Sequence, residues 1–281
     1  MITGALLRAS VGRLCRHFGT SSRRPVEPPA SSFCSMYRLA RREMRNTAIG
    51  LLSARQAPDD PLFVLAPMGR SGSHLLVSYL DSLPSVAMVG EALNPNESFG
   101  IRRRMVGRRR ALRHLAAVLG RLDGPVRGVK IIGHQLEQRR LRVADLNQRF
   151  PRARYIVIYR QALLEQYVSM LVARATGVWS SKGGVFDGHV QVNPSDFQVF
   201  AREHKERQLE LTKDLTSHVT IAYEELRADP EGVFADVVCP FLGMRYSQIS
   251  TGLNKRVDRP LHDVITNWAD VAHLQAIRAQ Y

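Results

Sequence analysis

The chain has 281 residues, 44% of them hydrophobic, with a formal net charge of +15 and a pI near 10.5. The length predicts one catalytic domain with extensions, and the charge favours anionic partners such as polyanions or anionic membrane surfaces. Nucleic acid is not the expected partner, because helix-turn-helix, zinc-binding and RNA-recognition signatures are absent, and no apolar run approaches the roughly 18 residues of a membrane span.

Residues 1–58 are predicted to form a basic extension and residues 59–281 the catalytic domain. The first 26 residues contain five arginines and no acidic residue. One helical face of this stretch is apolar: Leu7, Val11, Leu14 and Phe18. This composition is typical of an organellar transit peptide, and the alternatives are a disordered basic tail or a translation start placed too far upstream. A peripheral helix is expected over residues 35–54.

The most informative segment is a strand, loop and helix that begins at residue 62. An apolar strand is predicted over Leu62–Ala66, followed by the loop Gly69–His74, GRSGSH. The next residues predict a helix with one apolar face: Leu75, Leu76, Tyr79, Leu80 and Leu83. Loop N–H groups and a helix N-terminus that converge on one point form an anion site, most often for phosphate. The alternative is an ordinary turn rich in small residues.

This loop differs from the loop of nucleoside-triphosphate-binding proteins. The GxxxxGK[ST] pattern needs a lysine for the terminal phosphates and a hydroxyl for Mg²⁺. Here Gly72 is followed by Ser73 and His74, and the cation, Arg70, precedes the glycine. The pattern predicts an anionic ligand bound without a metal and argues against a small-molecule kinase, which remains the first alternative.

The middle of the chain contains a dense run of arginines. It comprises residues 102–104, 108–110 and 113, and leads into an apolar helical stripe: Leu115, Val118, Leu119 and Leu122. The run predicts contact with an acidic acceptor or an anionic lipid surface, or else a solvated helix face. A strand is predicted over Val126–Ile132, followed by Gly133-His134-Gln135.

A second anion site is predicted after another apolar strand, Arg154–Tyr159. Arg160 ends this strand, and Ser169 follows nine residues later on a helix whose predicted buried face is Leu163, Leu164, Tyr167, Val168, Leu171 and Val172. Open α/β sheets bind ligands at the carboxyl ends of their strands, so Arg160 and Ser169 are expected to hold one phosphate together. Farther along, a loop over residues 177–196 is expected to act as a lid or acceptor rim. A helix is predicted over residues 196–215 and a strand over residues 219–222.

Five segments in this order resemble the sulfotransferases that use 3′-phosphoadenosine 5′-phosphosulfate (PAPS), over roughly residues 61–273. VGEALNP at residues 89–95 resembles the nodulation-protein-H-like carbohydrate branch of the family. The other four segments are GRSGSHLL, YRQALLEQYVSMLVA, the late AYEEL…DP…FLG run and LHDVITNWADV. Two features depart from the family pattern: His74, where Thr or Ser is common, and the nine-residue spacing, where eight is frequent.

The resemblance implies a P-loop-like three-layer α/β fold with a central parallel sheet of four or five strands flanked by helices. It implies that Ser71, Gly72, Ser73 and His74 bind the 5′-phosphate and that Arg160 and Ser169 bind the 3′-phosphate. Arg70 would bind the donor and offset charge on the leaving oxygen. Lys255 and Arg256 complete the predicted nucleotide-binding set. No metal site is predicted.

Glu91 is the first candidate for the catalytic base, because the chain returns to the carboxyl edge of the sheet there and the carbohydrate branch has a glutamate in this segment. Burial is expected to raise its pKa towards the operating pH. His134 is the second candidate, since it follows Lys130 at a strand end. Lys130 itself is a candidate for charge in the sulfate pocket.

The sequence therefore predicts a PAPS-dependent sulfotransferase that acts on a hydroxyl of a carbohydrate or glycolipid. The second alternative is a non-catalytic binder of anionic lipid or nucleic acid on the same fold. The three cysteines, Cys15, Cys34 and Cys239, form no CxxC pair, which favours a reduced compartment. We expect a cytoplasmic, membrane-peripheral protein, or an organellar one if the N-terminus is a targeting segment. The pattern predicts neither the individual acceptor nor the oligomeric state.

Overall fold

The computed structural model describes residues 56–101, 107–179, 185–253, 255 and 257–280. They contain a five-stranded, all-parallel sheet in the order β2-β3-β1-β4-β5. Its strands in chain order are β1 (Leu62–Ala66), β2 (Val86–Glu91), β3 (Val126–Ile132), β4 (Arg154–Tyr159) and β5 (Ser217–Ala222). The predicted α/β fold with a central parallel sheet flanked by helices is confirmed, and the predicted bounds of β1, β3 and β4 are correct.

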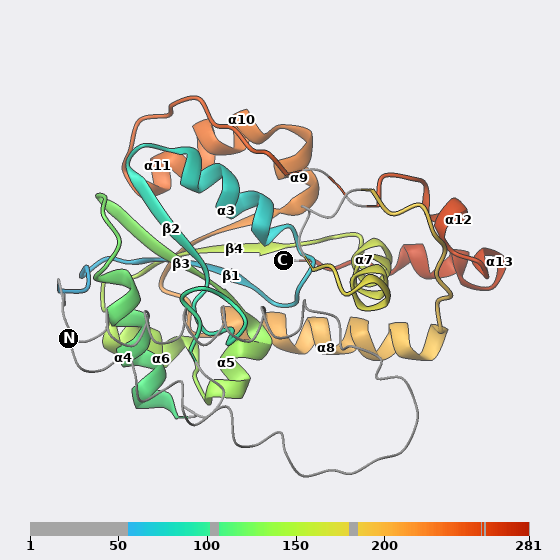
Figure 1. The fold of residues 1–281 in the computed structure, drawn as a ribbon, viewed down its shortest axis with the longest axis horizontal. Coiled ribbons are helices and arrows are strands. Elements are labelled where there is room, and N and C mark those ends of the chain that lie inside the picture. The colour runs from blue at the N-terminus through green and yellow to red at the C-terminus, as the bar shows by residue number, and fades with distance from the viewer. Residues whose placement is uncertain (1–55, 102–106, 180–184, 254, 256, 281) are drawn as a thin grey trace, which may run out of the picture. The chain divides into compact units, whose positions relative to one another are not determined.

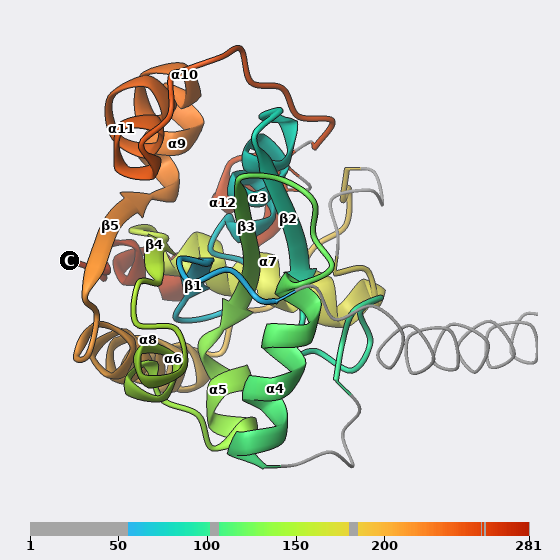
Figure 2. The same cartoon turned by 90° about the vertical axis from the view of Figure 1, so that its left-hand side faces the viewer.

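Helices cover both faces of the sheet, which is why β1 is apolar throughout and β3 and β4 are mainly apolar (Figures 1 and 2). In β1, Leu62, Val64 and Ala66 face one core and Phe63 and Leu65 face the other. The first core packs against α3 (Ser73–Ser82), α9 (Tyr223–Ala228), α10 (Pro230–Val233) and α11 (Cys239–Leu242). The second packs against α4 (Arg108–Leu119), α5 (Gly133–Arg139) and α6 (Val143–Arg149).

A third core lies beyond the ends of the strands. It joins α7 (Leu163–Thr176) and α8 (Pro194–Thr212) to the C-terminal α12 (Leu261–Val264) and α13 (Trp268–Val271). Tyr167 contacts Phe197 and Phe200 here, with ring centroids 5.6 and 5.2 Å apart. This packing fixes α7 beside the carboxyl end of β4, where the second anion site is predicted.

Strand β2 was not predicted as a strand. Its sequence, VAMVGE, is only partly buried because it lies at the edge of the sheet, and its apolar run stops at Gly90 and Glu91. Its register with β3 shifts between Val89 and Glu91, which brings Glu91 opposite Lys130. The shift therefore places a carboxylate and an ammonium at one sheet edge.

The remaining sequence predictions differ from the structure mainly at element ends. Helix α8 begins two residues before its prediction because the Asn193 side chain caps it, and it ends at Thr212 rather than residue 215. Strand β5 starts at Ser217 rather than residue 219. In the predicted lid, Val190 forms a bridge with Ile265, so this part is tied to the C-terminal segment. The predicted N-terminal helix and transit segment, and Arg102–Arg104, lie outside the described residues.

The described part of the arginine run forms an amphipathic helix. Helix α4 buries Ala111, Leu115, Val118 and Leu119 and exposes Arg109, Arg110 and Arg113. Arg108 is paired instead, with its guanidinium 3.0 Å from the carboxylate of Asp145. No helix within the described ranges is both long and apolar enough to cross a bilayer.

Candidate active site

The loop between β1 and α3 has the geometry of an anion site. Arg70 and Gly72 have positive φ values of 65° and 89°, so the backbone turns sharply before the helix begins at Ser73. A Cβ at Gly72 would lie 2.2 Å from Cδ2 of Tyr223, so only glycine fits this close contact. Ser71 is fully buried, and its hydroxyl finds no hydrogen-bond partner within the described part of the chain. A buried, unpaired hydroxyl beside a helix N-terminus is consistent with a bound anion.

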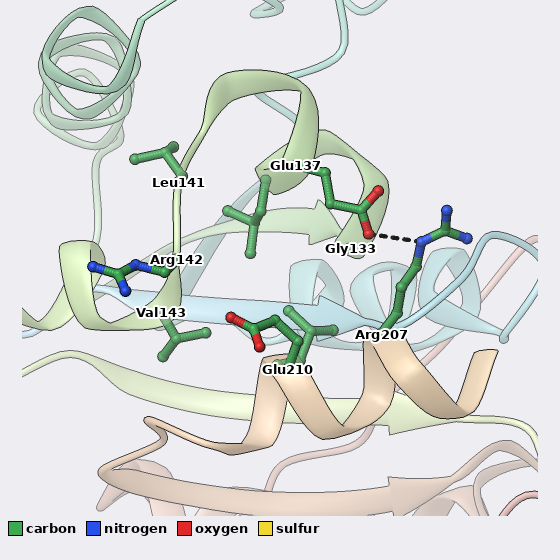
Figure 3. Close-up of a pocket in the computed structure, with 9 residues that line it drawn as sticks. Gly133, Glu137, Leu141, Arg142, Val143, Arg207 and Glu210 are labelled. Atoms are coloured by element: carbon green, nitrogen blue, oxygen red, sulfur yellow. Dashed lines mark hydrogen bonds and ion pairs between the residues drawn. The ribbon is translucent and has the colours of Figure 1, made fainter. Parts of the chain in front are cut away.

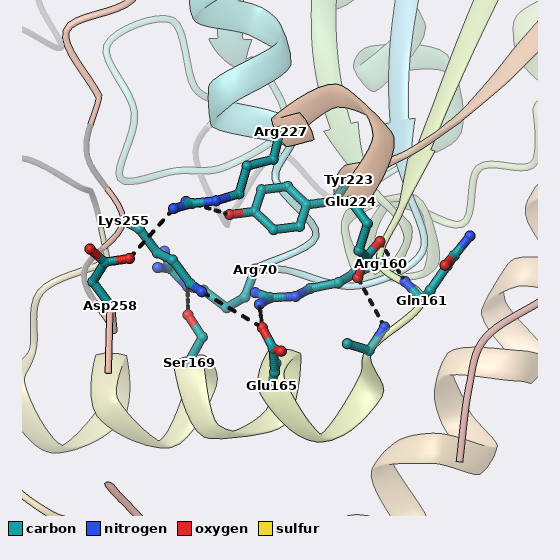
Figure 4. Close-up of polar contacts among 11 residues, drawn as sticks. Arg70, Arg160, Gln161, Glu165, Ser169, Tyr223, Glu224, Arg227, Lys255 and Asp258 are labelled. Carbon is teal, nitrogen blue, oxygen red and sulfur yellow. Dashed lines mark hydrogen bonds and ion pairs between the residues drawn. The ribbon is translucent and has the colours of Figure 1, made fainter. Parts of the chain in front are cut away.

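Arg70 connects this loop to α7. Its Nε donates a hydrogen bond to the hydroxyl of Ser169 at 3.0 Å, and its Nη1 donates to the carbonyl of Trp179 at 2.6 Å. Ser169 was predicted to act with Arg160, whereas its hydrogen bond in the structure is with Arg70. Arg70, a residue of the first predicted phosphate site, therefore contacts a residue of the second (Figure 4).

Arg160 is largely buried at the end of β4, where its guanidinium stacks 4.7 Å from the ring centroid of Tyr223. Its Nη2 forms an ion pair with Glu165, and the same carboxylate oxygen lies 3.9 Å from Nζ of Lys255. The Arg160 Nε is buried and makes no hydrogen bond to any other described residue. Arg160, Lys255 and Ser169 thus lie around one acidic side chain (Figure 4). Arg256 falls outside the described residues.

Two neighbouring residues of the late motif support both anion sites, and their roles were not predicted. Tyr223 packs against Gly72 and under Arg160, while Glu224 accepts hydrogen bonds from the backbone N–H groups of Gln161 and Ala162, each at 3.0 Å. The pairing of β4 with β5 causes this, because Tyr159 lies opposite Ala222 and the following residues of the two strands meet. The AYEEL motif marked these residues in the sequence. Their contacts could not be predicted from it, because they depend on β5 pairing with β4.

The first candidate base lies in a dense polar cluster. Oε1 of Glu91 is 2.9 Å from Nζ of Lys130 and 3.7 Å from Nε2 of His74. Its Oε2 accepts hydrogen bonds from the side-chain amides of Gln135, at 2.6 Å, and Asn94, at 2.9 Å. His74 was predicted to bind the 5′-phosphate, whereas the structure places its ring beside this carboxylate.

The electrostatics of Glu91 differ from the expectation. Burial alone would raise its pKa, but the nearby His74 ring, the charge of Lys130 and the amide of Asn94 together hold the pKa well below the usual range. The expected rise in pKa was therefore wrong for this arrangement. Glu91 is a charged carboxylate held by several donors, and an acceptor hydroxyl has to compete with them.

His134, the second candidate base, lies in the first turn of α5, next to the Gln135 that contacts Glu91. Burial lowers the pKa of His134, and the nearby charge of Glu91 opposes this effect. Lys130 is completely buried; burial lowers its pKa and the charge of Glu91 partly offsets the change. The two candidate bases and Lys130 thus belong to one electrostatic cluster at the ends of β2 and β3.

A separate small pocket lies between α5, α6 and α8 (Figure 3). Its lining is apolar, with Leu136, Leu141, Val143 and Leu211, and an ion pair between Glu137 and Arg207, 2.8 Å long, lies at its edge. None of the predicted site residues lines it. Within the described ranges, no group of three His, Cys, Asp or Glu side chains is arranged to hold a metal ion.

No protein-family model and no curated protein sequence matches the chain. Among solved structures, similarity is found to a sulfotransferase from Alicyclobacillus acidocaldarius, with a TM-score of 0.43 and 14% identity over 69% of this chain and 86% of that one. A mouse sulfotransferase complexed with PAP gives a TM-score of 0.40 and 16% identity over 71% and 65% of the two chains. The sulfotransferase domain of the Synechococcus PCC 7002 olefin synthase gives 0.41 and 17% over 77% and 84%. At such low identities and TM-scores, the activity has to be inferred from the side chains of this chain.

Proposed function

We propose that this protein transfers a sulfuryl group from PAPS to a hydroxyl of a carbohydrate or glycolipid. The observation that carries the proposal is that the residues of the two predicted anion sites lie at neighbouring strand ends. The loop after β1 offers Ser71 and the N-terminus of α3, and the end of β4 offers the buried Arg160. A nucleotide with separate 5′- and 3′-phosphate groups would fit this pair of sites, which the hydrogen bond from Arg70 to Ser169 joins.

The chemistry follows from the positions of these charges. In the proposed transfer, the acceptor oxygen forms a bond to sulfur while the bond from sulfur to the bridging oxygen of the donor breaks. Arg70 would offset the negative charge that develops on the bridging oxygen, and Glu91 would take the hydroxyl proton. Lys130, 2.9 Å from Glu91, would add positive potential where the sulfuryl group passes. As in phosphoryl transfer, positioning and electrostatics supply most of the catalysis.

Support for a carbohydrate acceptor comes from the segment VGEALNP, which resembles the carbohydrate branch and contains Glu91. The exposed arginines of α4 are consistent with an acceptor presented at an anionic membrane surface. An acceptor screen with labelled donor sulfate tests this part of the proposal. Transfer to small phenols or amines, with no transfer to sugars or glycolipids, would contradict it.

We expect adenosine 3′,5′-bisphosphate to bind about 10–100-fold more tightly than adenosine 5′-monophosphate. The extra phosphate gains charge-assisted contacts with Arg160 and Ser169, and one such contact contributes about 1.5–3 kcal/mol. Titration calorimetry with the two nucleotides measures the difference. Equal affinities would remove the donor assignment.

We also expect activity to persist in excess EDTA, because Arg70, the loop N–H groups and the N-terminus of α3 supply the positive potential that Mg²⁺ supplies in kinases. The assay follows labelled sulfate with EDTA, with added Mg²⁺ and with neither. Loss of all activity in EDTA, restored by Mg²⁺, would favour the small-molecule kinase instead.

A further inference from the structure

An acidic side chain lies among the very cations assigned to the 3′-phosphate. Glu165 is in the first turn of α7, and one of its carboxylate oxygens contacts both Arg160 and Lys255. Ser169 follows it by four residues and therefore lies on the same face of the helix, one turn along. Figure 4 shows the carboxylate directed toward the cationic groups above α7.

The contacts of Arg160 indicate that this acid is a temporary partner. A buried guanidinium needs a counter-charge, and Glu165 supplies one. The Nε of Arg160 nevertheless stays buried and unpaired within the described residues, so Glu165 satisfies the guanidinium incompletely. Stacking on Tyr223 holds Arg160 in place independently of Glu165. The Glu165 side chain is 38% exposed and can turn into solvent, whereas the Arg160 side chain is 7% exposed and cannot.

We propose that Glu165 is a placeholder for the 3′-phosphate: it neutralises Arg160 and Lys255 when the nucleotide is absent and is displaced when the phosphate binds. This inference rests on the proposed function. A carboxylate and a phosphate cannot occupy the same position, because their like charges repel. The nucleotide must therefore break the contacts of Glu165 with both cations, so Glu165 weakens binding of the 3′-phosphorylated product and favours its release.

The test is calorimetry on the full-length protein with two probes, adenosine 3′,5′-bisphosphate and adenosine 5′-monophosphate. We expect Glu165→Gln to bind the bisphosphate about 10–100-fold more tightly than wild type, the range for one charged contact. Binding of the monophosphate should not change, because that nucleotide lacks the phosphate that competes with Glu165. Glu165→Asp retains the charge on a shorter side chain and should fall between wild type and Glu165→Gln.

Asp258→Asn is the matched control, since it removes the same charge from the same polar group of residues. Asp258 contacts Arg227 rather than Arg160 or Lys255, so this variant should bind both probes like wild type. Unchanged or weaker bisphosphate binding by both Glu165 variants would overturn the placeholder proposal. An equal gain in Asp258→Asn would also overturn it, because the effect would then come from overall charge.

The proposed function can fail separately. The proposed function is tested by the ratio of bisphosphate to monophosphate affinity in wild type. The placeholder proposal is tested by the change in bisphosphate affinity that Glu165→Gln causes. A wild-type preference with no gain in the variant leaves the function and removes the placeholder. A preference that appears only in Glu165→Gln supports the displacement of Glu165, while the donor assignment fails for the wild-type protein. No preference in either protein removes both.

Discussion

Replacing Glu91 with glutamine is expected to lower turnover by about 10²–10⁴-fold, the usual contribution of a general base. Glutamine keeps the shape of the side chain but loses the charge that accepts the proton. It also leaves the buried Lys130 without its counter-charge, so the variant should be less stable than wild type. Nucleotide affinity should stay close to that of wild type, because the cations assigned to the nucleotide, Arg70 and Arg160, have their contacts on α7 instead. Single-turnover rates and calorimetry on the same preparations measure the two effects separately.

His134→Asn and His74→Asn are the controls for this assignment. His134 is the second candidate base, and the ring of His74 lies 3.7 Å from the carboxylate of Glu91. Near-normal turnover in Glu91→Gln, together with loss of activity in His134→Asn, would reverse the roles of Glu91 and His134. Loss of activity in His74→Asn alone would instead assign proton removal to the loop histidine.

The pH dependence separates a carboxylate from a histidine. The lowered pKa of Glu91 keeps its charged form present as the pH falls, until the pH reaches that lowered pKa. If Glu91 is the base, the rate should therefore stay nearly level between about pH 5 and 8. If His134 is the base, activity should fall as the pH drops through the pKa of His134, which burial places below the usual 6.5. A steep acidic limb in this range would count against Glu91.

The parts of the fold that could be predicted from the sequence are those that a pattern of neighbouring residues marks. Strands β1, β3 and β4 are buried at nearly all positions, so a mainly apolar run of 5, 7 and 6 residues marks them. The loop after β1 was recognised because its glycine, serines and arginine are contiguous. Strand β2 was missed because an edge strand needs no such run, and its register shift beside Gly90 depends on pairing with a strand about 40 residues away.

The contacts of the site residues could not be predicted from the sequence either, because they join residues far apart in the chain. Arg70 meets Ser169 across 99 residues, and Glu91 meets Gln135 across 44. These contacts depend on the strand order and on where α7 and α5 begin. The pKa of Glu91 shows the consequence: burial was foreseeable, but the donors that reverse its effect come from α3, β3 and the turn after β2. Candidate residues could be named from the sequence, but their pKa shifts could be predicted only from the folded arrangement of the strands.

Replacing Arg70 with alanine is expected to impair both binding and chemistry. Loss of a charged contact should weaken binding of the bisphosphate by about 10–100-fold. Turnover at saturating donor should fall by a further 10²–10³-fold, roughly the effect of removing one group that stabilises transition-state charge. The contrast with Glu91→Gln arises because Arg70 lies next to the donor in both the ground and the transition state. Calorimetry and single-turnover kinetics measure both losses.

Arg70→Lys tests whether charge alone is sufficient at this position. Lysine keeps the charge but cannot reproduce the two directed hydrogen bonds that the guanidinium makes to Ser169 and to the carbonyl of Trp179. We expect it to recover most of the binding and little of the turnover, because catalysis depends on the fixed position of the charge. Full recovery of both by lysine would show that position is unimportant. Unchanged kinetics in Arg70→Ala would mean that Arg70 only joins the loop to α7. The charge opposite the leaving oxygen would then have to come from another cation, and Lys130 is the cation nearest to Glu91.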